Sequence, residues 1–147
     1  MTETSGLSKN LPHQSADISF DNLCRIRSLF LSFITYFAFS ADFSECDLRY
    51  AEFLGINLSE KTFHRSTLTA TRFTNCKLCG SNFSESSFKD AIFYNCNLQD
   101  ATFTEVKHLF INPMENKIKN TSIDILAAGN IVNHFGFNID WLYPNSE

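Results

Sequence analysis

The side chains best suited to redox or metal chemistry are two cysteines spaced as Cys76-Lys77-Leu78-Cys79. Thiols at this spacing can form a redox-active pair or one half of a zinc site. No second Cys or His pair lies at ligand spacing, and His64 stands beside Arg65 with no nucleophile or acid next to it. The sequence also lacks a Gly-x-Ser-x-Gly, a phosphate-binding glycine loop and a His-Glu-x-x-His. We therefore expect no enzyme, with no catalytic residues, no metal site and no cofactor.

A second candidate for function is an acidic surface. The chain carries 12 Lys and Arg against 16 Asp and Glu, for a formal net charge of −4. This balance argues against direct binding of nucleic acid, which normally needs a basic surface, and it suits attraction of a basic partner. Acidic residues concentrate at the start of the repeats described next. The candidate partner-binding residues are Asp42, Glu45, Asp47 and Glu52.

The elements that would position these side chains follow from a repeat of five residues in 41–105. A period of five suits neither an α-helix nor a flat strand, whereas a fixed short repeat is typical of a solenoid. The residue two places before each repeat centre is usually small, which lets a small and a large side chain fill a narrow interior together. The centres, predicted to form the core, are Phe43, Leu48, Phe53, Leu58, Phe63, Leu68, Phe73, Leu78, Phe83, Phe88, Phe93, Leu98 and Phe103.

The length of one coil follows from residues of similar type that recur at a spacing of twenty. Phe43, Phe63, Phe83 and Phe103 fall in one column, and Asn75-Cys76 recurs as Asn95-Cys96. Stacked Asn side chains can hydrogen bond along such a column. With parallel strands about 4.8 Å apart, the thirteen repeats predict a rod only about 15 Å long.

The repeats resemble those of the pentapeptide-repeat family, whose pattern is Ala-(Asp/Asn)-Leu-x-x. Ala41-Asp42-Phe43-Ser44-Glu45 and Ser81-Asn82-Phe83-Ser84-Glu85 carry this resemblance most clearly. The resemblance implies an all-β solenoid: a right-handed, quadrilateral, parallel β-helix with four pentapeptides in each coil.

The same resemblance supplies two hypotheses for function. The first is a non-enzymatic, protein-binding scaffold with an unknown partner, because solenoids present large flat surfaces. The alternative comes from the quinolone-resistance proteins of the family, which are bacterial, dimeric rods whose acidic surface imitates DNA. They bind type II topoisomerases, so DNA gyrase or topoisomerase IV would be the partner. A short rod, a modest charge and an uninterrupted segment 41–105 distinguish this chain from them.

The N-terminal part reads as a disordered leader in 1–14 and a cap in 15–40 with degenerate repeats or a helix. Asp21–Phe39 shows an apolar stripe at helical spacing, which fits a helix over the open end of the solenoid. The alternative is a degenerate coil, because the five-residue register is preserved across this segment. The apolar run Ser28–Ala41 is short for a membrane span of roughly 20 residues, so we do not expect it to cross a membrane, and membrane association through this run is a third hypothesis for function.

The five-residue repeat ends before 106–147. We predict that 106–147 forms a C-terminal capping segment with a helix. Thr121, Ser122 and Asp124 suit the start of this helix, and Gly136 fits its C-terminal cap. The helix could close the solenoid or join two copies as a homodimer. Trp141-Leu142-Tyr143 forms an apolar group that could pack on the last coil or on a second subunit. The candidate dimer or cap residues are Ile123, Leu126, Ile131 and Phe135.

The number of cysteines is informative about the cellular compartment of the protein. The chain has five cysteines, an odd number, and no recognisable secretory signal. Both observations favour reduced thiols and a cytoplasmic protein.

Overall fold

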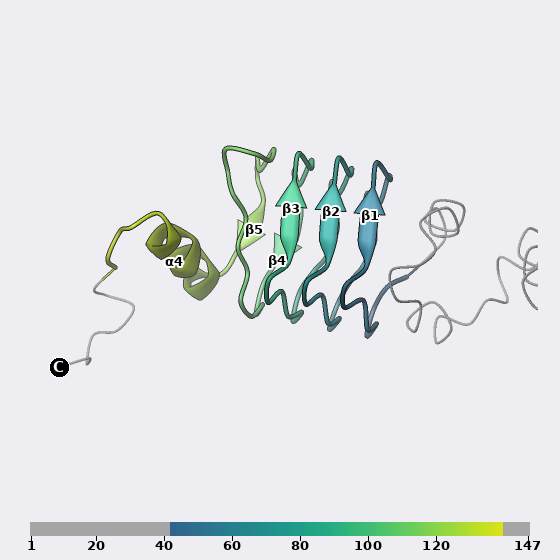
Figure 1. Cartoon of the computed structure of the whole chain (residues 1–147), viewed down its shortest axis with the longest axis horizontal. Coiled ribbons are helices and arrows are strands. Elements are labelled where there is room, and N and C mark those ends of the chain that lie inside the picture. The colour runs from purple at the N-terminus through teal and green to yellow at the C-terminus, as the bar shows by residue number, and fades with distance from the viewer. Residues whose placement is uncertain (1–41, 140–147) are drawn as a thin grey trace, which may run out of the picture.

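The computed structural model describes residues 42–139, which form a β-helix followed by a C-terminal helix (Figure 1). The leader and cap predicted for 1–14 and 15–40 lie outside the described residues. The group Trp141-Leu142-Tyr143 lies outside them as well.

Parallel pairing at a spacing of twenty residues builds the β-helix. Strands β1 (Glu52–Leu54), β2 (Arg72–Thr74) and β3 (Ile92–Tyr94) form a three-stranded sheet in that order, with Phe53 opposite Phe73 and Phe73 opposite Phe93. Strand β4 (Thr102–Phe103) pairs with β5 (Ser122–Ile123) at the same spacing. Figure 1 shows β1, β2 and β3 side by side on successive coils.

Four ladders of backbone pairing run along the β-helix, one for each pentapeptide of the coil. Each ladder joins residues that lie twenty apart in the sequence, which agrees with the coil length predicted from the residue columns. The ladders run through Asp47/Thr67/Ser87/Lys107, Glu52/Arg72/Ile92, Asn57/Lys77/Asn97/Lys117 and Thr62/Asn82/Thr102/Ser122.

Tight turns at the corners of the coil explain the five-residue period. In one of them Ala51 N donates to Leu48 O across Arg49 and Tyr50, and Tyr50 has a φ of 65°. A positive φ at the third residue is the requirement of a type II turn. Every fifth residue from Glu45 to Glu105 has such a left-handed φ, and only Gly55 and Gly80 among them are glycine. Bonds to the next coil hold these corners, as where Tyr50 N donates to Thr69 O.

Stacked aromatic rings fill the interior. All thirteen predicted centres are buried, with at most 3% of any side chain exposed. Phe43, Phe63 and Phe83 stack with ring centroids 4.9 and 4.6 Å apart, close to the spacing of the coils. The neighbouring column meets them edge to face, as with Phe73 and Phe83 at 5.9 Å. Aromatic rings favour both arrangements, so one core satisfies packing within and between columns.

The small inward position also carries hydrogen bonds, a role that the sequence analysis did not predict. Thr71 Oγ1 donates to Leu48 O at 2.7 Å, and Ser81 Oγ donates to Leu58 O at 2.7 Å. Ser86 Oγ donates to Phe63 O at 2.6 Å and accepts from Ser66 N at 3.0 Å. These side chains link one coil to the one before it, and they satisfy backbone groups that the turns leave in the interior.

The coil continues past residue 105, where the sequence analysis ended the repeats. Thr102 pairs with Ser122, and Phe103 pairs with Ile123, so 104–123 completes one more coil. The side-chain pattern does change there: His108, at the next expected centre, is exposed, and Leu109 is buried instead. Backbone bridging needs no particular side chain, which explains why the coil outlasts the apolar repeat.

Helix α4 (Ile125–His134) closes the described part of the chain, beyond β5 (Figure 1). Of the three residues predicted to suit the helix start, Asp124 is the N-cap: Oδ1 accepts from Ala127 N at 2.8 Å, and Oδ2 accepts from Glu105 N at 2.7 Å. Gly136 follows the helix with a φ of 90°. Within residues 42–139, no helix has the length and apolar character that spanning a membrane requires.

Candidate protein-binding surfaces

The Cys-x-x-Cys segment does not form a shared site. Cys76 points inward and is buried, whereas Cys79 is half-buried on the outward side. Across 42–139, no three side chains of His, Cys, Asp or Glu come together as metal ligands. His64 Nε2 lies 3.8 Å from Glu85 Oε1, so it faces a carboxylate and not a nucleophile.

Cys76 and Cys96 stack on adjacent coils and act as donors to the backbone. Cys76 Sγ donates to Phe53 O and Cys96 Sγ donates to Phe73 O, both at 3.2 Å. A hydrogen bond with Cys76, together with burial, raises the pKa of the Cys96 thiol. Cys76, Cys79 and Cys96 are free thiols, whereas Cys46 is disulfide-bonded, which contradicts the expectation of a reduced thiol at Cys46.

The four acidic candidates do not gather on one surface. The residue after Asp42, Phe43, donates its N–H to Thr62 O, so Asp42 lies beside the ladder that contains Thr62. Asp47 and Glu52 belong to two other ladders. Asp47 forms an ion pair with Arg49 at 2.6 Å, and Glu52 lies 3.9 Å from Arg72. The coil therefore distributes these charges around its circumference and pairs two of them with cations.

A different set of acids shares one position on successive coils. Glu45, Glu85 and Glu105 occupy the same left-handed corner, with Arg65 between the first two. Arg65 Nε donates to Glu85 Oε2 at 2.8 Å, and this hydrogen bond holds the pKa of Glu85 below its usual range. The corner column is acidic, but the cation within it reduces its charge.

Apolar side chains stand out on the outward side of β1, β2 and β3, which we call the β1–β3 face. Leu54, Ile92 and Tyr94 leave 59%, 47% and 52% of their surface exposed. Asn95 Nδ2 donates to Asn75 Oδ1 at 2.7 Å at its border, which confirms the predicted Asn ladder. The sequence analysis missed this face because it read the centre of each repeat. The available signal was an apolar residue directly beside a buried Phe, at a position otherwise polar.

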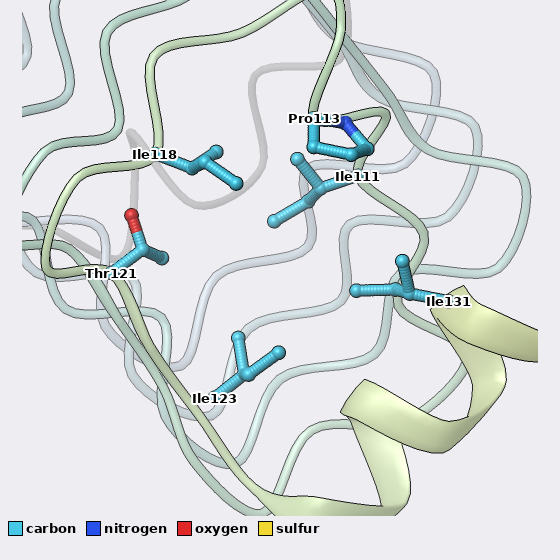
Figure 2. A pocket seen from close by; sticks show the side chains of 6 residues that line it. All are labelled: Ile111, Pro113, Ile118, Thr121, Ile123 and Ile131. Atoms are coloured by element: carbon cyan, nitrogen blue, oxygen red, sulfur yellow. The ribbon is translucent and has the colours of Figure 1, made fainter.

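The C-terminal end of the β-helix carries an apolar pocket of about 140 Å³ (Figure 2). It lies between the last coil and α4, and Ile131 of α4 forms one wall. Ile123, a candidate for the helix, is instead part of β5 and lines the same pocket. Leu126 and Phe135 are exposed and do not line it. The lining residues are Ile111, Pro113, Ile118, Thr121, Ile123 and Ile131.

Comparison with known proteins identifies the repeats. Residues 66–105 match the profile described as Pentapeptide repeats, in eight copies. This stretch of the chain consists of pentapeptide repeats. No curated protein sequence matches it. The repeats and the observed coils agree on a β-helix.

Three solved structures of the family are similar to this chain. One is from the thylakoid lumen of Arabidopsis thaliana: 26% identity, TM-score 0.41, covering 54% of this chain and 49% of that one. QnrB1, a plasmid-mediated fluoroquinolone resistance protein, has 15% identity and a TM-score of 0.34 over 65% of this chain and 85% of its own. Rfr23 of the cyanobacterium Cyanothece has 21% identity and a TM-score of 0.23 over 55% and 58%. The chain spans about half the length of the Arabidopsis protein.

Proposed function

We propose that this protein, which contains pentapeptide repeats, is a non-enzymatic scaffold that binds another protein through the β1–β3 face. The observation that carries the proposal is the exposure of Leu54 on β1 and of Ile92 and Tyr94 on β3, the two outer strands of one three-stranded sheet. Exposed apolar side chains that gather on one face of a protein mark interaction surfaces. We also take the β-helix to be right-handed and quadrilateral, as the family implies, and the protein to be cytoplasmic.

The chemistry of the face suits a protein partner. Tyr94 combines a large apolar ring with a hydroxyl, the kind of side chain enriched at interface centres. Glu52 of β1 and Arg72 of β2 lie on the same sheet as the apolar residues, and their 3.9 Å ion pair is exposed on both sides. An exposed pair of this kind contributes little to folding, so both charges remain available to a partner. The partner should therefore present an apolar centre with charged groups around it.

The test uses two exposed tyrosines as a matched pair. Tyr94→Ser alters the β1–β3 face, whereas Tyr50→Ser removes an even more exposed ring at a corner outside it. A partner captured by crosslinking to the wild-type chain is purified, and its dissociation constant is measured by calorimetry. We expect Tyr94→Ser to weaken binding about tenfold or more and Tyr50→Ser to leave it unchanged. Equal effects of the two variants would contradict the proposed face.

A second proposal is that the protein binds a type II topoisomerase as a DNA mimic. The corner column of Glu45, Glu85 and Glu105 favours it, because acids at a regular spacing along a rod can imitate phosphates. We rank this proposal below the scaffold for two reasons. Arg65 lies within the acidic column, and the acids Asp42, Asp47 and Glu52 are spread over three ladders. The family relationship to QnrB1, a fluoroquinolone resistance protein, suggests the experiment.

That experiment measures supercoiling by DNA gyrase over a concentration series of the protein, with and without a fluoroquinolone. If the proposal is right, the wild-type protein inhibits or protects the enzyme, and Glu45→Lys/Glu85→Lys/Glu105→Lys loses the effect. Thr69→Lys/Asp90→Lys, which adds positive charge at another corner, serves as the control. An equal loss in the control would show that the effect depends on overall charge. No effect of the wild-type protein at micromolar concentration would remove this proposal and leave the scaffold.

We also propose that α4 can join two copies of the chain. Ile125, Leu126 and Phe135 are exposed at the end of the rod, where a second copy could approach tail to tail. Sedimentation equilibrium tests this: the wild-type chain should dimerise, and Leu126→Ser/Phe135→Ser should be monomeric at the same concentration. A monomeric wild-type chain at 100 µM or above would remove the proposal.

A further inference from the structure

Residues 116–120 of the last coil form a strand edge that is open along the described chain. In the coil before it, Leu98 N donates to Lys117 O at 2.8 Å, and Asp100 N donates to Lys119 O at 3.0 Å. The equivalent donors of the last coil are the N–H groups of Ile118 and Asn120. Within residues 42–139, neither of these two groups donates a hydrogen bond. An unpaired row of backbone groups is a template for an added strand.

The N-cap of α4 covers a different corner of the same coil. There, Glu105 N donates to Asp124 Oδ2 at 2.7 Å, so a side chain takes the place of a following coil. The side chains of Lys117, Ile118 and Lys119 are exposed instead. The start of α4 therefore closes one side of the coil and leaves 116–120 accessible.

The apolar pocket adjoins this open edge. Ile118 and Ile123 line it and remain 40% and 37% exposed, whereas Leu98, one coil earlier, is completely buried. Each earlier centre is covered by the centre of the next coil, and within the described chain no coil follows Ile118. Figure 2 shows Ile118 across the pocket from Ile131 of α4, so the space between them is open to an inserted side chain.

The size and lining of the pocket suit one apolar side chain. Its volume of about 140 Å³ is close to the roughly 150 Å³ of an apolar cavity that holds a single benzene ring. Its only polar lining side chain is Thr121, whose Oγ1 already donates to Leu98 O at 2.7 Å. A polar occupant would lose its water without gaining a partner, so a side chain such as leucine fits best.

Two lysines set the charge of the edge. Lys117 and Lys119 stand on either side of Ile118 and, in the part of the chain that the structure describes, neither forms an ion pair. Side chains alternate along a strand, so both lysines point outward where Ile118 points inward. An added strand would lie about 4.8 Å away, close enough for an acidic residue opposite each lysine to form a favourable pair. The complement of Lys-Ile-Lys is therefore acidic, apolar, acidic.

We propose that residues 116–120 bind an acidic, extended segment of a partner protein as an added parallel strand. The apolar residue of the segment fills the pocket over Ile118, and the acidic residues on either side lie beside Lys117 and Lys119. The backbone pairing continues that of the earlier coils: the first acidic residue accepts from Ile118 N and donates its N–H to Asn116 O. This site lies at the end of the rod, separate from the β1–β3 face.

Peptide binding to the full-length protein tests the proposal. The probe is a fluorescein-labelled peptide, Ser-Thr-Glu-Leu-Glu-Thr-Ser, measured by fluorescence anisotropy. We expect saturable binding with a Kd below about 1 mM. Replacing the Leu of the peptide by Ser should weaken binding about tenfold or more, because the pocket then stays unfilled. Equal binding of the two peptides would overturn the proposal. So would a lack of saturation, because the chain itself or a second copy would then cover the edge.

Methylation of single peptide nitrogens tests the strand pairing. In the parallel register, the N–H of the first Glu faces Asn116 O, whereas the N–H of the Leu points away from the β-helix, as that of Leu98 points away from the coil before it. N-methylation of the first Glu should weaken binding about threefold or more. N-methylation of the Leu should leave it nearly unchanged. Equal effects of the two methyl groups would show that the peptide does not add a strand, which would overturn the proposal.

Charge reversal tests the two lysines. Lys117→Glu/Lys119→Glu should weaken binding about fivefold or more, and this variant should prefer a peptide with Lys-Leu-Lys at its centre. Lys77→Glu/Lys89→Glu is the matched control: it makes the same change of charge at exposed lysines of earlier coils, and Lys77 lies on the ladder of Lys117. The control should bind the acidic peptide as the wild type does. An equal loss in the control, or no change of preference, would overturn the proposal.

Discussion

The coils of residues 42–103 and the last coil, 104–123, share one backbone plan but differ in their side chains. Both keep parallel pairing at a spacing of twenty residues. In the earlier coils a Phe or Leu occupies every central position and is buried. In the last coil the four corresponding positions hold His108, Pro113, Ile118 and Ile123, all of them exposed.

This difference shows that backbone register and core register are separate properties of a solenoid. Each finished coil offers a row of N–H and C=O groups, so the next coil can pair with it whatever side chains it carries. Burial requires an apolar residue at every fifth position. Where that requirement lapses, the coil leaves an open apolar pocket, and α4 covers only part of it.

The largest predicted effect separates the two regions by their cores. Phe73→Ala should destabilise the protein by about 3–5 kcal/mol, because it removes a ring stacked between Phe53 and Phe93 and leaves a cavity. Ile118→Ala, at a central position of the last coil, should cost less than about 1 kcal/mol, because the side chain is 40% exposed. Urea unfolding monitored by circular dichroism measures both. Similar losses for the two variants would contradict the distinction between the regions.

The sequence predicted the core well because its signal is redundant. Each of the thirteen centres repeats the same information, and the columns at a spacing of twenty add an independent check. The repeats end at residue 105, as the family match does, and backbone pairing continues beyond it, because the sequence reports side chains and the coil is continued by backbone bonds. His108 and Leu109 mark the place where the two registers separate.

A second prediction concerns the buried hydrogen bonds that join the earlier coils. Ser86→Ala removes the donor to Phe63 O and the acceptor for Ser66 N, so two buried backbone groups lose a partner. We expect a loss of about 1–3 kcal/mol. Ser59→Ala is the control, because Ser59 is on the outward side and only half-buried. Equal urea midpoints for Ser86→Ala and the wild type would mean that the inward hydroxyl only fills space.

The surfaces were predicted less well than the core, and the reason is geometric. Asp42, Asp47 and Glu52 are close in sequence, but a coil that turns a corner every five residues places them on different ladders. The residues that do share a surface, such as Leu54 and Tyr94, lie forty apart in the sequence. On a solenoid, a surface must therefore be read at the spacing of the coil and not along the chain.

The smallest predicted effect tests how the last coil is joined to α4. Asp124 caps the helix through Ala127 N and also accepts from Glu105 N, which links the helix to the coil before it. Asp124→Ala should cost about 0.5–2 kcal/mol, because both N–H groups lose their acceptor. Hydrogen exchange should show faster exchange in α4 and unchanged protection in β1, β2 and β3. Asp124→Asn, which keeps a capping oxygen, should retain most of the protection in α4. If protection were lost equally along the whole β-helix, the end and the earlier coils would unfold as one unit, and the last coil would owe its stability to the same core as the others.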